Sequence, residues 1–205
     1  MPVVVVANPK GGVGKTTVAT NIAGYFASQG HQVMLGDADR QQSSLLWLHL
    51  RPPEARPIAS WEVGHEKVAK PPRGTTHVVL DTPAGLHGRW MKETLGVADK
   101  VVVPLAPSIF DIYATRAFLD ELAQHRRTER LQVGIVGMRV DQRTIASEKL
   151  QEFVAGLGLP VLGFLRPTQN YVYLAARGLT LFDLAPSKVE RDLEQWQGIC
   201  RWLDA

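Results

Sequence analysis

Short apolar runs alternate along the chain with longer stretches in which apolar positions recur every three or four residues. Runs of the first kind are typical of buried strands, and the periodic stretches are typical of helices packed on one face. The runs predict strands at residues 3–7, 32–35, 77–80, 100–105, 132–138 and 161–165. The periodic stretches predict helices at residues 15–29, 41–50, 111–125, 145–157, 171–177 and 187–203.

The predicted strands are nearly continuous runs of valine, leucine and isoleucine, with few polar positions between them. Strands of this kind are buried on both faces, which indicates a mainly parallel sheet with helices on both faces. We therefore expect an α/β fold in a single domain, residues 1–205, a length that suits one domain. Residues 51–75, which are rich in proline and glycine, are predicted to form a surface excursion.

A glycine-rich loop follows the first predicted strand and opens the first predicted helix. Glycines allow successive backbone N–H groups to turn inward around phosphate oxygens, and the positive end of the following helix points at the same charge. In such a loop Lys15 reaches the β- and γ-phosphates, and the Thr16 hydroxyl binds magnesium. The predicted phosphate contacts are Gly11, Gly12, Val13, Gly14, Lys15, Thr16 and Thr17.

Aspartates close two further predicted strands. Asp37 and Asp39 follow the second strand, and Asp81 follows the third. The carboxyl ends of parallel strands share one edge of the sheet, where open α/β sheets bind ligands. We expect Thr16, Asp39 and Asp81 to form a magnesium site, with Asp37 in a structural or outer-shell role. Asp39 is also placed to orient an attacking water; the alternative, that it caps the next helix, does not exclude catalysis.

Composition narrows the classes of function. The chain has 23 Lys and Arg against 20 Asp and Glu, a net charge of +3 that permits weak attraction to polyanions without demanding it. No apolar run approaches the roughly 20 residues of a membrane span, and the first residues lack signal-peptide features, so we expect a cytoplasmic protein. The one cysteine, Cys200, excludes an internal disulfide and a cysteine-based metal or iron–sulfur site.

The loop departs from the general phosphate-loop pattern at Pro9, where a glycine is expected, and it carries a second lysine, Lys10. Its sequence Lys-Gly-Gly-Val-Gly-Lys-Thr-Thr resembles the deviant Walker A motif of the ParA/MinD ATPases. The resemblance implies that the protein binds ATP and Mg²⁺, and that Lys10 reaches across a dimer interface to the partner's nucleotide. Lys10, Lys15 and Asp39 are then the catalytic residues.

The resemblance extends over essentially the whole chain. Residues 37–41 are similar to the D-x-D-P-Q segment, whose second aspartate supports hydrolysis, although Arg40 replaces the proline. Residues 81–83 resemble the D-x-P switch, and residues 98–111 a segment of small ParA proteins. Residues 166–183 resemble the segment beside the adenine, which implies nucleotide contacts from Arg166 and Pro167.

The small ParA class hydrolyses ATP slowly, forms nucleotide-sandwich homodimers, binds DNA without sequence preference when loaded, and is stimulated by a ParB-like partner. The resemblance implies these properties for this chain, including association with the nucleoid in the ATP-bound form. Arg143 and Arg166 are the preferred DNA-binding residues because both lie near similar positions in the family. Further basic candidates are Arg126, Arg127, Arg130, Arg139, Lys149 and Arg177.

Two alternative functions share the loop. A MinD-like positioning ATPase would end in a basic amphipathic helix that binds a membrane, whereas residues 187–203 carry an apolar stripe beside a mixed-charge face and are expected to pack on the core. Amide-forming synthetases of the dethiobiotin or cobyrinate type remain open, because fold and loop alone do not determine function.

Overall fold

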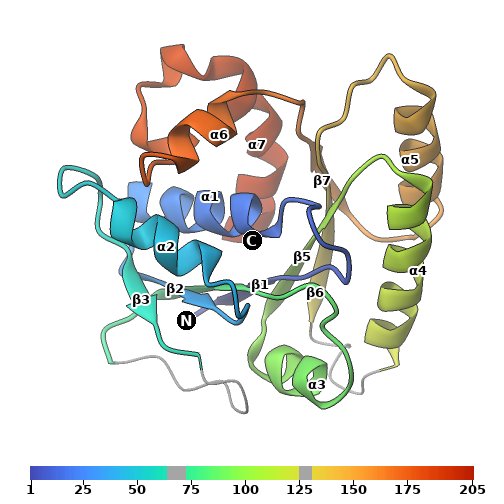
Figure 1. The fold of residues 1–205 in the computed structure, drawn as a ribbon, viewed down its shortest axis with the longest axis horizontal. Coiled ribbons are helices and arrows are strands. Elements are labelled where there is room, and N and C mark those ends of the chain that lie inside the picture. The colour runs from blue at the N-terminus through green and yellow to red at the C-terminus, as the bar shows by residue number, and fades with distance from the viewer. Residues whose placement is uncertain (64–72, 125–130) are drawn as a thin grey trace.

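A seven-stranded sheet forms the centre of the computed structural model, which describes residues 1–63, 73–124 and 131–205 (Figure 1). The strand order is β3-β2-β4-β1-β5-β6-β7, and every neighbouring pair is parallel. The prediction of a mainly parallel sheet is confirmed. The strands are β1 Val3–Val6, β2 Val33–Asp37, β3 Ala59–Trp61, β4 His77–Asp81, β5 Lys100–Leu105, β6 Gln132–Gly137 and β7 Val161–Phe164.

Helices cover both faces of this sheet. Figure 1 shows α1 on one side and α3 on the opposite side, with α4 and α5 beside the β5 to β7 half. The helices are α1 Lys15–Ser28, α2 Ser43–Leu50, α3 Gly88–Val97, α4 Ile109–Ala123, α5 Ile145–Ala155, α6 Asn170–Ala175 and α7 Glu190–Asp204. Two 3₁₀ turns, η2 Leu181–Asp183 and η3 Pro186–Lys188, precede α7.

The valines of β1 explain why both faces need a cover. Val3 and Val5 face the core that α3, α4 and α5 complete, whereas Val4 and Val6 face the core under α1 and α7. Side chains alternate across a strand, so a run of four valines has no polar face to expose. The strand is therefore buried on both sides, with no more than 6% of any of the four valines exposed.

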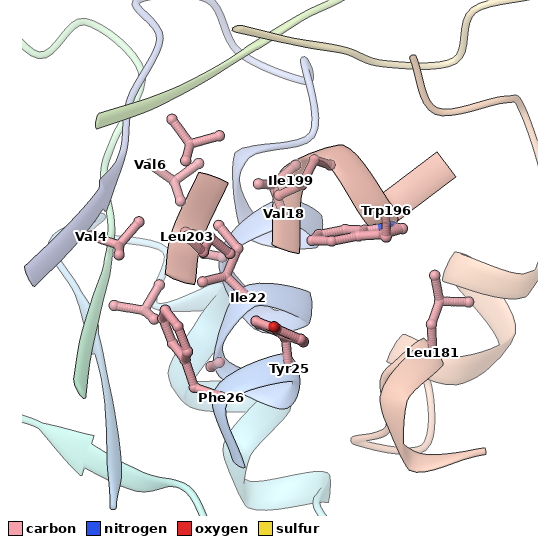
Figure 2. Close-up of a cluster of buried hydrophobic side chains, with 14 of the residues drawn as sticks. Val4, Val6, Val18, Ile22, Tyr25, Phe26, Leu181, Trp196, Ile199 and Leu203 are labelled. Atoms are coloured by element: carbon pink, nitrogen blue, oxygen red, sulfur yellow. The ribbon is translucent and has the colours of Figure 1, made fainter. Parts of the chain in front are cut away.

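The terminal helix packs on the core as expected. Trp196, Ile199 and Leu203 on α7 are buried beside Val18 and Ile22 of α1 (Figure 2). The last carbonyls of a helix lack partners within the helix, and here the Lys100 ammonium of β5 donates to those of residues 202 and 203 at 2.6 and 2.9 Å. Across the three described ranges, no helix is long and apolar enough to cross a membrane.

Two elements differ from the sequence prediction. Within the predicted surface excursion, Ala59–Trp61 forms the edge strand β3 and buries Trp61 against the sheet. Three residues are too few to show a period, which is why the pattern missed this strand. The pattern also predicted no helix at Gly88–Val97, where α3 buries Met91 and Leu95 among mainly polar neighbours.

Candidate functional site

The parallel register brings the predicted loop and carboxylates to one edge of the sheet. Strand β4 lies between β2 and β1, and Asp81 at its end is level with Asp37 of β2 and Val6 of β1. The glycine-rich loop leaves β1 two residues after Val6. The two aspartates and the loop, 20 or more residues apart along the chain, therefore lie side by side.

The loop has the backbone of a phosphate cradle. Gly12 and Gly14 have φ values of 73° and 101°, in the left-handed region that favours glycine. Gly14 is also the residue before α1, so the N–H groups of the first helical turn point back into the loop. A side chain at Gly14 would meet Met138, because a Cβ there would lie 2.7 Å from its terminal methyl group.

Lys15 lies inside this cradle with 7% of its surface exposed. Its ammonium donates to the carbonyl oxygen of Lys10 at 2.7 Å. Burial lowers the pKa of Lys15, while the charges of Asp81 and Asp39 oppose that shift. The two carboxylates thus offset only part of the cost of burying this cation.

Asp81 connects the helix after the loop with α2 through hydrogen bonds. Its Oδ2 accepts hydrogen bonds from the hydroxyls of Thr16 and Ser44, each at 2.7 Å. Its Oδ1 is buried and has no hydrogen-bond partner in the described part of the chain. Burial raises the pKa of Asp81 to about 6, although both hydroxyl donors act to lower it. A buried carboxylate oxygen without a donor is rare in folded proteins, and it points to a ligand.

Asp37 holds the segment that follows β2. Its two carboxylate oxygens accept the N–H groups of Asp39 and Ser44, at 2.9 and 2.7 Å. Burial raises the pKa of this carboxyl too. The structure therefore favours the structural role among those expected for Asp37.

Ser44 is the residue that sequence reasoning missed. A serine with no neighbouring base does not look catalytic, yet Ser44 is fully buried and bridges the two aspartates, since its amide bonds Asp37 and its hydroxyl bonds Asp81. The signal available in the sequence was a small hydroxyl residue at the start of a helix that follows a strand-ending aspartate.

The oxygen ligands at this edge fit a magnesium ion. Magnesium prefers carboxylate, hydroxyl, water and phosphate oxygens, and the Thr16 hydroxyl lies against Asp81, whose free Oδ1 is placed to hold a metal-bound water. Within the residues that the structure describes, no group of three or more His, Cys, Asp or Glu side chains forms a metal cage. The site is thus suited to magnesium that arrives with phosphate oxygens, as P-loop magnesium does.

Asp39 lies in the loop between β2 and α2, outside the hydrogen bonds around Asp81. Its Oδ1 accepts the N–H of Gln41 at 3.0 Å, which makes a tight local turn. The N-cap position of α2 is Gln42, so the alternative role of Asp39 as a helix cap is wrong. Asp39 is partly exposed, and its charge is near enough to Lys15 to oppose the lowering of that lysine's pKa by burial.

A hollow of about 340 Å³ opens beside the loop. Arg166 and Pro167 line it, as does Tyr171, and Gly14 and Thr17 of the loop form its other wall. Met138 and Arg139 close it from the end of β6. The structure thus brings the predicted nucleotide contacts from residues 166 and 167 next to the phosphate cradle, at a place where a base would meet largely apolar walls.

Arg143 and Arg166, the residues preferred for DNA binding in the sequence analysis, line a second hollow of about 490 Å³, which Arg191 also lines. Arg143 is 88% exposed and is held by both oxygens of Asp141. Arg166 is less accessible, since 31% of its side chain is exposed and it pairs with the buried Asp192 at 2.7 Å. The candidates Arg126, Arg127 and Arg130 lie outside the described residues.

A glycine-rich cradle that opens a helix, beside strands that end in buried aspartates, defines the P-loop nucleotide-binding class of α/β proteins. The chain belongs to the family described as "CobQ/CobB/MinD/ParA nucleotide binding domain", which matches residues 4–181. The family resemblance found in the sequence is thereby confirmed.

Individual relatives support this placement. "Maintenance of carboxysome distribution protein A" of Gloeobacter kilaueensis is 30% identical over 212 aligned positions, which cover 98% of this chain and 94% of the relative. Among solved structures, the MinD cell division protein of Aquifex aeolicus has a TM-score of 0.76 at 18% identity, covering 99% and 96% of the two chains. The ATP complex of Cyanothece McdA carrying D38A has a TM-score of 0.75 at 17% identity, covering 97% and 96%.

The raised pKa of Asp81 predicts that Asp81→Asn stabilises the protein. A carboxyl whose folded pKa lies above its unfolded value stabilises the fold fully below the unfolded pKa, and this contribution is lost as pH rises through about 6. Without nucleotide and with a chelator, the variant should gain at most about 3 kcal/mol at pH 8, and the gain should vanish near pH 4.

Urea unfolding at several pH values measures this difference. Asp120→Asn, on the exposed face of α4, is the matched control and should stay within about 0.5 kcal/mol of the parent protein. A variant less stable than the parent at every pH would contradict the description of Asp81 as an uncompensated buried acid.

Proposed function

We propose that this chain is an ATPase that ATP and magnesium switch into a homodimer, and that it serves a DNA partition or cargo-positioning system. Its family, the second lysine of its loop and its similarity to a protein named for the maintenance of carboxysome distribution support the proposal. The name of that relative favours a protein assembly as cargo over a plasmid or a chromosome region.

The placement of Lys10 carries the proposal. Its backbone is bonded on both sides, whereas its side chain is half-buried, and within the described residues the ammonium has no hydrogen-bond or ion-pair partner. The Lys10 ammonium lies beside a phosphate cradle and is not neutralised by its own chain. Such a cation can bind a phosphate of the nucleotide that a second copy carries. The dimer would then form only when nucleotide is bound.

The residues of the site divide the work of ATP hydrolysis. The N–H groups of residues 11–17 and the Lys15 ammonium bind the phosphates, and the Thr16 hydroxyl and Asp81 hold magnesium. Bound magnesium neutralises the charge that develops on the phosphate oxygens. Arg166 and Pro167 hold the base beside the loop.

Asp39 is the residue proposed to orient the attacking water, and through that water it would also take part in the magnesium site expected from the sequence. Asp39 is partly exposed at the cradle, whereas Asp37 is buried with both oxygens bonded to backbone N–H groups, and Asp81 is buried with its free Oδ1 assigned to magnesium. The local turn at Gln41 holds the Asp39 side chain in place while leaving its second oxygen available.

The proposed ATP-bound dimer binds DNA without sequence preference and associates with the nucleoid, and a small ParB-like partner stimulates its hydrolysis. Arg143 can bind DNA at little cost, because its pair with Asp141 is exposed and screened by solvent, and a phosphate can replace that carboxylate. Arg166 contributes from the same hollow. The apolar stripe of α7 is buried in the core and is therefore not available for a MinD-like membrane contact.

Lys10→Ala should weaken ATP-dependent dimerisation about 10-fold or more, since each charge-assisted hydrogen bond is worth about 1.5–3 kcal/mol. Lys15→Ala should instead weaken ATP binding by the monomer. Light scattering with ATP, ADP and a slowly hydrolysed analogue, together with nucleotide titration, measures both. The control is Lys92→Ala, on the exposed side of α3, and a parent chain that stays monomeric with the analogue would contradict the dimer.

Asp39→Ala should slow single-turnover hydrolysis by about 10²–10⁴-fold, because a group that positions water acts mainly in the transition state. ATP affinity should change little, and the ATP-bound dimer should persist longer. Filter binding and rapid-quench assays separate the two effects. A loss of affinity with unchanged hydrolysis would reject this role.

DNA affinity of the ATP-bound dimer should fall with salt at a log–log slope of about −0.9 per phosphate contacted, and it should differ little between two unrelated duplexes. Arg143→Ala should lower both affinity and slope while sparing dimerisation. Arg166→Ala should also lower DNA affinity, but because Arg166 is proposed to hold the base, it should weaken ATP binding as well. Circular dichroism must show a native fold for this variant, because the buried Asp192 loses its ion-pair partner and keeps only the hydrogen bond from Asn170. Full binding by the double variant would reject this surface. No ATP-dependent binding at low salt would favour a positioning ATPase that uses another matrix, or the synthetase class.

A further inference from the structure

Asn8 stands between β1 and the phosphate loop, and it is a polar residue with no exposed surface. A buried amide is retained only where its donors and acceptor are used. The three groups to which Asn8 is hydrogen-bonded therefore indicate its function.

The side chain of Asn8 joins three separate segments. Its Nδ2 donates to the carbonyl oxygen of Pro104 at the end of β5 and to the Thr115 hydroxyl on α4, each at 2.9 Å. Its Oδ1 accepts the backbone N–H of Lys10 at 2.8 Å. The orientation of the amide is unambiguous, because a carbonyl oxygen can only accept and a backbone N–H can only donate.

These bonds fix the backbone on both sides of the Lys10 side chain. The Oδ1 contact closes a turn across Pro9, whose ring already restricts φ, and the Lys10 carbonyl accepts from Lys15 at 2.7 Å. The Pro9 carbonyl in turn accepts the N–H of Gly85, from the turn after β4, at 2.9 Å. Within the described residues, the side chain of Lys10 is thus the part of this residue without a hydrogen-bond or ion-pair partner.

We propose that Asn8 is a positioning residue for Lys10: by tying the Lys10 backbone to β5 and α4, it sets the direction in which that ammonium leaves the loop. The inference rests on the proposed function, in which Lys10 meets the nucleotide of a second copy. A lysine has many rotamers, so an interface contact gains most when the backbone that carries it is already fixed.

The alternative is that Asn8 only holds the fold together. In that case its removal would lower ATP binding, dimerisation and stability together, because the loop as a whole would loosen. A positioning role makes a different prediction. The loop N–H groups and Lys15 would still bind ATP in the monomer, and only the step that uses Lys10 would suffer.

A cycle of three variants tests the inference: Asn8→Ala, Lys10→Ala and the double variant. Dimerisation with a slowly hydrolysed ATP analogue is measured by sedimentation, and analogue affinity of the monomer by titration at low protein concentration. Asn8→Ala should weaken dimerisation about 10-fold and change monomer affinity less than about twofold. The double variant should dimerise no worse than Lys10→Ala alone, because both changes remove one interaction.

Thr115 supplies a matched pair that leaves the loop sequence untouched. Thr115→Val removes the hydroxyl that accepts from Asn8 with almost no change in volume, and should weaken dimerisation in the same direction, whereas Thr115→Ser keeps the hydroxyl and should restore it. This pair decides the question if Asn8→Ala does not fold.

The outcomes separate this inference from the function on which it rests. Equal loss of monomer affinity and dimerisation, losses that add in the double variant, or normal dimerisation of both Asn8→Ala and Thr115→Val would overturn the positioning role while leaving the dimer intact. Normal dimerisation of Lys10→Ala would overturn the proposed part of Lys10 itself, and with it the inference.

Discussion

The site depends on the burial of the Asp81 carboxylate at the end of β4, the strand between β2 and β1. Thr16 of the loop and Ser44 of α2 both donate to its Oδ2, and Asp37 on the adjacent strand holds the amide of the same serine. The loop, the segment after β2 and the sheet edge are therefore parts of one hydrogen-bonded unit. A change in what Asp81 binds would reach both the phosphate cradle and α2.

This arrangement keeps a charge where it costs stability. Burial raises the pKa of Asp81 and of Asp37, and two hydroxyl donors offset the cost for Asp81 only in part, since its Oδ1 has no partner in the described chain. Such sites are retained for function more often than for stability. Lys15 is the opposite case, a buried cation whose pKa is lowered by burial. Bound phosphate would offset the charge of Lys15, and magnesium would offset the charge of Asp81.

The sequence by itself determined the class of fold and the nature of the site. Four consecutive valines in β1 require a cover on both faces, which leads to a parallel sheet between helices. Gly14, with its positive φ, and the Lys15 and Thr16 that follow it form the phosphate cradle within a few residues of chain. These features were predictable because periodicity, glycine geometry and helix ends are local properties, decided between near neighbours.

The tertiary structure alone decided which distant groups meet. Thr16 and Asp81 are 65 residues apart, Ser44 and Asp81 37 residues, and Asn8 and Thr115 107 residues, so no local pattern links them. It also decided that Arg166 pairs with Asp192, which makes it less accessible than its charge suggests, and that a three-residue segment becomes the edge strand β3. The identity of a residue determines the chemistry of its side chain. Which partner the side chain meets depends on the register of the strands and on the packing of helices across them, and both depend on interactions along the whole chain.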